Sequence, residues 1–159
     1  MATPATWPSK RLGDLAKFRN GVNYDKTSFG QGVKVVGVKD FQDYTQPRYT
    51  ELEQINPEGV VTERNMLRDG DIVIVRSNGN RQLIGRSLYI ATLPEPVTHS
   101  AFTIRLRFTS HAVHPRFYAY VFRSPLNRRR FWAAAVYAVV EVTLTGWSSA
   151  GPRHSCHPG

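Results

Sequence analysis

The stretch between residues 68 and 90 constrains the fold more than any other part of the chain. The apolar run Ile72–Val75 and a second run at residues 83–90 are separated by the pair Asn78-Gly79. Short apolar runs rich in β-branched residues are typical of buried strands, and Asn-Gly between two of them is a strong hairpin signal. We therefore predict an antiparallel hairpin with its tip at residues 76–82.

Other segments predict further strands, followed by helices. In the segment at residues 101–108 apolar and polar residues alternate from Phe102 onward, which predicts a half-buried strand whose outward face carries Thr103, Arg105 and Arg107. The β-branched run at residues 33–38 predicts another strand. Ser124-Pro125 places an N-cap residue before a proline at the first position of a late helix. Because strands come first and the best helices follow, the predicted class is α+β.

Charge is distributed unevenly between the two parts of the chain. Residues 1–60 hold eight Lys/Arg and seven Asp/Glu, whereas residues 61–159 hold thirteen Arg and five Asp/Glu, so most of the net charge of +9 lies in the second part. Arginine suits phosphate oxygens and the guanine edge of the major groove, and the balance favours a polyanionic partner. A solvated basic surface is the alternative.

Several functional classes are disfavoured by missing features. The single cysteine, Cys156, precludes a disulfide framework within the chain and argues for a reducing, cytoplasmic setting. No apolar run approaches the ~20 residues that span a bilayer, and the first residues lack the pattern of a signal peptide. Phosphate-binding glycine loops, nucleophile elbows and metal-ligand spacings are also missing. We expect a non-catalytic protein without a metal or a cofactor of its own.

The predicted hairpin tip is the best candidate for a binding site. Arginine can contact guanine through two hydrogen bonds, and asparagine or glutamine can do the same with adenine. The tip supplies these side chains at Arg76, Ser77, Asn78, Asn80, Arg81 and Gln82. Neighbouring cations are expected to reach DNA phosphates, namely Lys34, Lys39, Arg86, Arg105 and Arg107. The alternative is that Asn-Gly serves only the turn and that the arginines serve only solubility.

Four segments, in order, resemble the target recognition domain of type I restriction-modification specificity subunits. They are WPSKRLGDLAKFRNG at residues 7–21, VVGVKDF at residues 35–41, LRDGDIVIVRSNG at residues 67–79 with IGR at residues 84–86, and FYAYVFRSPLNR at residues 117–128. The resemblance covers about residues 7–135, and the domain it implies is residues 1–135. It implies a mixed, strongly curved β-sheet of short strands and hairpins with a few packing helices.

The resemblance also implies a function. Such a domain binds one half of a split target in double-stranded DNA and positions a DNA adenine methyltransferase (modification) subunit and a restriction subunit. S-adenosylmethionine and ATP belong to those partners. A full specificity subunit has two such domains, so self-association of two half-subunits is a further expectation. The competing hypotheses are a basic protein-interaction module without DNA sequence preference and a binder of single-stranded RNA.

The end of the chain departs from the family pattern. Residues 136–159 lack the closing turn and strand that the family would place there, and the character of the sequence changes abruptly after Ala135. We therefore predict that residues 136–159 are an atypical tail, either out of frame or truncated.

Overall fold

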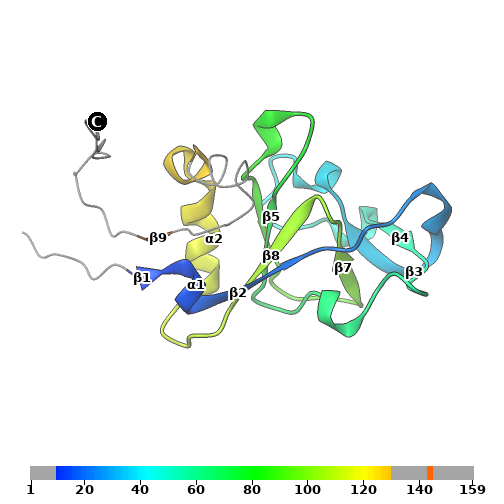
Figure 1. Ribbon diagram of the computed structural model, residues 1–159, viewed down its shortest axis with the longest axis horizontal. Coiled ribbons are helices and arrows are strands. Elements are labelled where there is room, and N and C mark those ends of the chain that lie inside the picture. The colour runs from blue at the N-terminus through cyan, green and yellow to red at the C-terminus, as the bar shows by residue number, and fades with distance from the viewer. Residues whose placement is uncertain (1–9, 130–142, 145–159) are drawn as a thin grey trace, which may run out of the picture.

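The computed structural model describes residues 10–129 and 143–144 (Figure 1). Its strands are β1 (Lys10–Arg11), β2 (Ala16–Asn20), β3 (Phe29–Val36), β4 (Glu53–Ile55), β5 (Ile72–Val75), β6 (Ser87–Tyr89), β7 (Val97–His99), β8 (Thr103–Phe108) and β9 (Thr143–Leu144). Its helices are α1 (Leu12–Leu15) and α2 (Pro115–Arg123), with the 3-10 turns η1 (Lys26–Ser28), η2 (Val38–Phe41), η3 (Tyr49–Glu51), η4 (Glu63–Asn65) and η5 (Arg81–Leu83). Short strands with few helices confirm the predicted α+β class.

The predicted hairpin is present within a four-stranded antiparallel sheet of order β2-β8-β5-β6. Ile72 pairs with Tyr89 and Ile74 pairs with Ser87, so β5 and β6 are its two arms. The tip was predicted at residues 76–82, but the strands are joined by the longer segment of residues 76–86, which we call the hairpin connection. The left-handed residue in this connection is Gly85, with a φ of 79°.

A second sheet has mixed strand directions. β3 is antiparallel to β4 and parallel to β7, which gives the order β4-β3-β7. β3 begins earlier than the predicted strand at residues 33–38, and Val38 belongs to η2. Across the described residues the strands form these two sheets and the β1-β9 pair, instead of the one strongly curved sheet that was expected.

The apolar run of β5 is explained by burial on both of its faces. Ile72 and Ile74 pack in one cluster with Phe122 of α2, while Val73 and Val75 pack in another cluster on the opposite side. The first cluster joins α2 to the four-stranded sheet, as Figure 1 shows for α2 beside β5 and β8. The second cluster also contains Val36 of β3 and Val97 of β7, so it joins the two sheets. A strand covered on both faces must be apolar throughout.

The prediction that Thr103 and Arg105 lie on an exposed face of β8 is wrong. Thr103 is fully buried and Arg105 is only 5% exposed. β8 lies between β2 and β5, and the Arg105 guanidinium donates to backbone carbonyls of residues 64 and 66, which cover this side of the strand. Strict alternation identified the strand correctly but not the solvent-facing side, because both of its faces are covered.

The predicted boundary at residue 135 lies outside the described residues. Of the predicted tail, residues 136–159, the structure describes only β9, which pairs antiparallel with β1 through Lys10 opposite Leu144 and Arg11 opposite Thr143. Within the described part of the chain, no helix is long and apolar enough to cross a membrane.

Candidate nucleic-acid interface

The hairpin connection is held in shape by its own asparagine side chains. Asn78 Oδ1 accepts a hydrogen bond from the backbone N–H of Asn80 at 2.7 Å, and Asn80 Oδ1 accepts one from the backbone N–H of Gln82 at 3.0 Å. Such side-chain turns are a local alternative to strand pairing. They use the two amide oxygens and leave both NH2 groups as donors. The asparagines therefore shape the loop and can still present hydrogen-bond donors.

Two arginines predicted to contact DNA, Arg76 and Arg86, brace this connection together with Arg128. The Arg76 guanidinium donates to the Ala101 carbonyl at 3.1 Å, and the Arg128 guanidinium donates to the Gln82 carbonyl. The Arg86 guanidinium donates to the Gln42 carbonyl and lies 3.4 Å from an Asp43 carboxylate oxygen. Because these guanidinium groups bond to loops that are distant in sequence, they fix the hairpin connection against the rest of the domain.

One open cleft, which we call the Phe102 cleft, lies beside the hairpin connection. It has a volume of about 410 Å³ and is lined by Tyr24, Gly37, Val38, Lys39, Glu53, Asn78, Gly79, Ser100 and Phe102. Lys39 Nζ lies 3.4 Å from a Glu53 carboxylate oxygen, so a positive and a negative group face each other there. Burial, followed by the carboxylates of Glu53 and Asp40, raises the pKa of Tyr24. The cleft therefore combines the Lys39–Glu53 ion pair, the Asn78 amide and the aromatic rings of Tyr24 and Phe102.

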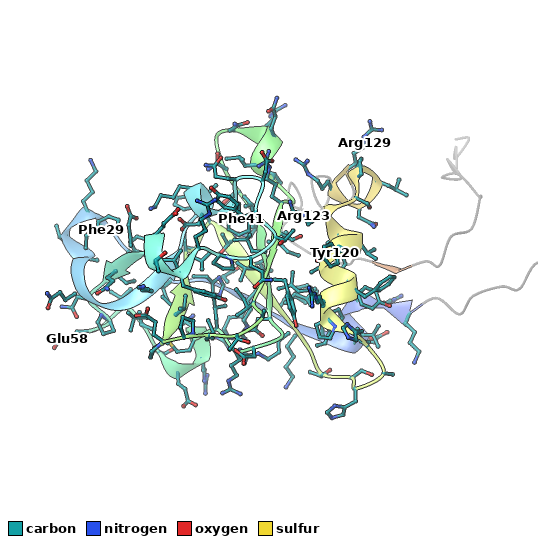
Figure 2. All side chains as sticks on the ribbon, turned by 180° about the vertical axis from the view of Figure 1, so that it is seen from behind. Phe29, Phe41, Glu58, Tyr120, Arg123 and Arg129 are labelled. Atoms are coloured by element: carbon teal, nitrogen blue, oxygen red, sulfur yellow. The ribbon has the colours of Figure 1, made fainter. Side chains whose placement is uncertain are left out.

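A second cleft, which we call the arginine cleft, has a different character. It has a volume of about 370 Å³ and is lined by Arg81, Gln82, Ile84, Pro125, Arg128 and Arg129. Its arginines come from η5 and from the short helical segment at residues 125–129, at whose end Arg129 is labelled in Figure 2. Three guanidinium groups around one open cleft create a positive potential that attracts an anion.

Arg105 and Arg107, on β8, are committed to contacts inside the protein. Arg107 Nε and Nη2 each lie 2.7 Å from a different carboxylate oxygen of Asp71, which makes a two-pronged ion pair with a buried partner. The Arg105 guanidinium donates to the Arg64 carbonyl at 3.0 Å and to the Met66 carbonyl at 3.2 Å. Burial, and then the charge of Arg107, lowers the pKa of Arg105. These two arginines hold the segment that covers β8.

Lys34 is committed in the same way. Its Nζ donates to the Tyr49 carbonyl at 2.6 Å and lies 2.7 Å from a Glu95 carboxylate oxygen. The structure thus divides the predicted site residues into separate groups. Lys39 and Asn78 share the Phe102 cleft, Arg81 and Gln82 share the arginine cleft, and Lys34, Arg105 and Arg107 lie in neither.

Sequence reasoning missed Phe102. It is the second residue of the predicted strand at 101–108, where the pattern gives it no special role. In the structure Ala101 and Phe102 form a turn before β8, and the Phe102 side chain is 57% exposed. The only sequence signal is Ser100, whose hydroxyl accepts a hydrogen bond from the Phe102 N–H at 3.2 Å and stabilises that turn.

Comparison with solved structures finds chains with a similar fold. A chain from a structure describing the complex assembly and conformational transition of a type I R-M system matches with a TM-score of 0.55 and 18% identity, over 82% of this chain and 31% of the other. The HsdS subunit from Thermoanaerobacter tengcongensis matches with a TM-score of 0.55 and 15% identity, over 86% of this chain and 38% of the other. No protein-family model and no curated protein matches the sequence.

These matches establish the fold. The expected resemblance to type I specificity subunits is confirmed at that level, over more than four-fifths of the chain. This chain spans about a third of the length of the solved chains, 31% and 38% respectively.

Proposed function

We propose that this chain is a DNA-reading module that acts as one target recognition domain of a type I restriction-modification specificity subunit. The observation that carries the proposal is the shared fold with solved type I chains over most of this chain. The net charge of +9 supports a polyanionic ligand. In this function the domain reads one half of a bipartite target in double-stranded DNA.

The two clefts assign different tasks to the candidate residues. Arg81 and Arg129 line the arginine cleft and contact backbone phosphates, which position a protein on DNA. Three polar side chains of the hairpin connection face base edges, namely Ser77, Asn78 and Asn80, while Gln82 lies with the arginines in the arginine cleft. The internally bonded cations support the binding surface from within, and these are Lys34, Arg76, Arg86, Arg105 and Arg107. This division departs from the sequence prediction for Arg76 and Arg81, which were assigned to bases. It also departs from that for Lys34, Arg86, Arg105 and Arg107, which were assigned to phosphates.

The module carries out no chemistry in this proposal. It positions an adenine methyltransferase subunit and a restriction subunit, which bind S-adenosylmethionine and ATP, in the cytoplasm. We further propose that two such domains associate to form a reader of both halves of the target.

Selection from a pool of random duplex DNA, with and without a methyltransferase subunit, tests the proposal. We expect a short enriched sequence, bound with an affinity that falls steeply as salt rises. Enrichment of no sequence would overturn the proposal. A pull-down dominated by one protein, without any duplex preference, would favour the basic protein-interaction module, and better competition by RNA than by duplex DNA would favour a single-stranded RNA binder.

A further inference from the structure

Phe102 is an exposed aromatic side chain on a firmly held stretch of backbone. Its carbonyl accepts hydrogen bonds from the N–H groups of Arg76 at 2.9 Å and Ser77 at 3.2 Å. The same bonds tie the start of the hairpin connection to the turn before β8. A single exposed aromatic residue is common on protein surfaces and by itself indicates nothing. The position of Phe102 in a cleft with Asn78 is what gives it a role.

The Phe102 cleft is poorly suited to a phosphate. The carboxylate of Glu53 lies in the cleft at 3.4 Å from Lys39 Nζ, which also lies 3.7 Å from an Asp40 carboxylate oxygen, so the positive charge of Lys39 is already neutralised. A phosphate would be repelled by this carboxylate, whereas the described residues that line the arginine cleft include three arginines and no acidic side chain. The Phe102 cleft therefore fits a neutral ligand group with polar and apolar parts.

Three chemistries meet in this cleft. The Asn78 amide oxygen is occupied by the Asn80 N–H, so Asn78 offers its NH2 group as a donor. The Glu53 carboxylate offers an acceptor, and the Phe102 ring offers an apolar surface. In the major groove an A·T pair presents an amino donor on adenine, a carbonyl acceptor on thymine and the thymine methyl group, while a G·C pair has no methyl group. The cleft and an A·T edge are complementary in all three respects.

We propose that the Phe102 cleft reads one A·T base pair and that the Phe102 ring contacts the thymine methyl group. Asn78 donates to the thymine carbonyl, and Glu53 accepts from the adenine amino group. This inference rests on the proposed function, since it requires that the chain bind duplex DNA. It adds a specificity-determining residue that lies outside the hairpin connection.

Replacing thymine by uracil tests this contact without altering the protein. Once a preferred duplex has been selected, each thymine is replaced in turn by uracil, which removes only the methyl group. Binding is then measured for the unaltered chain, for Phe102→Ala and Phe102→Leu, and for Phe117→Ala as the matched control. Phe117 is 61% exposed on α2, so the control also removes an exposed ring but leaves the cleft unchanged.

We expect one uracil substitution to weaken binding of the unaltered chain and of Phe117→Ala by about four-fold, the value of one buried methyl group. Phe102→Ala should bind the thymine and uracil forms equally, and Phe102→Leu should keep part of the difference. The inference is overturned if Phe102→Ala keeps the full penalty at every position, or if the selected sequence contains no A·T pair. If no sequence is selected at all, the proposed function fails first, and the two failures are thereby distinguished.

Discussion

Arginines on β8 and arginines beside the hairpin connection look alike in the sequence but have opposite surroundings. Arg105 and Arg107 are bonded to carbonyls and to the buried carboxylate of Asp71. Arg81 and Arg129 are exposed and line an open cleft together with a third arginine. The number of arginines in a chain therefore measures its charge, whereas only the fold determines which of those charges a ligand can reach.

The physical reason lies in the position of each element. β8 is an interior strand, and a guanidinium group on it must be paired because an unpaired buried charge is very costly. The segment at residues 64–67 supplies carbonyls for that purpose, and Asp71 supplies a carboxylate. The hairpin connection extends from the top of β5 in Figure 1, and Arg81 within it is exposed to water, which solvates its charge.

The largest expected effect is the loss of the Arg107–Asp71 ion pair. Arg107→Leu leaves the Asp71 carboxylate, whose side chain is 1% exposed, buried without its counter-charge. We expect the free energy of unfolding to fall by about 3–5 kcal/mol, measured by urea denaturation at neutral pH. The matched substitution Arg129→Leu should change it by less than about 0.5 kcal/mol.

The double variant Asp71→Leu with Arg107→Leu separates the ion pair from packing effects. Removing both charges should restore much of the stability that the single variant loses. If Arg107→Leu were no more destabilising than Arg129→Leu, the structural role of the β8 arginines would be wrong. Arg107 would then be available to a ligand, and the contrast between the two groups would disappear.

The next effect concerns His99, which is buried beside the same arginines. The Thr103 hydroxyl donates to the Ser100 carbonyl at 2.7 Å and so accepts from His99 Nδ1 at 2.9 Å, which places the neutral ring's proton on Nδ1. Nε2 is buried without a hydrogen-bond partner. Burial, and then the charges of Arg105 and Arg107, lowers the pKa of His99 to about 3.

This pKa predicts a loss of stability in mild acid. Between the folded pKa of about 3 and the ordinary value of 6.5, the unfolded chain binds a proton that the folded chain does not. Stability is therefore complete above pH 6.5 and falls as the pH drops, by roughly 1.4 kcal/mol per unit or about 2 kcal/mol at pH 5. Urea denaturation from pH 7.5 to 5 measures it. His99→Gln should reduce the change in the free energy of unfolding between pH 7.5 and 5. His111→Gln, at an exposed site, should leave that change as it is in the unaltered chain. An equal change for the two variants would contradict the role of His99.

Sequence reasoning succeeded where a local pattern has one structural solution. The run Ile72–Val75 could only be a buried strand, and the second apolar run had to return beside it, so the hairpin and the α+β class were predictable. Ser124 likewise precedes the helical segment at residues 125–129, whose first residue is Pro125. These features depend on neighbours in the chain.

Features that depend on distant segments could not be predicted. The burial of Arg105 requires residues 64–67 to cover β8, and no pattern within β8 reveals that cover. The Phe102 cleft unites residues 24, 39, 53, 78 and 102, which the sequence keeps far apart. The Asn78-Gly79 pair predicted a hairpin tip at residues 76–82, but the asparagine side chains bond to the backbone of a loop that continues to residue 86.

The smallest effect on folding is expected at the arginine cleft, whose exposed arginines contrast with the internally bonded arginines of β8. Arg81→Ala and Arg129→Ala should leave the free energy of unfolding within about 0.5 kcal/mol of the unaltered chain. Each should weaken binding to all duplexes alike and make the plot of log affinity against log salt shallower by about 0.9, the value for one lost phosphate contact.

Arg116→Ala is the matched control, because it removes an exposed positive charge from α2 and lies outside the arginine cleft. It should leave the salt dependence unchanged, since the slope counts phosphates that are directly neutralised and not the total charge of the protein. An equal change for all three variants would mean that binding follows net charge alone. The arginine cleft would then have no special place in DNA binding, and exposure alone would separate its arginines from those of β8.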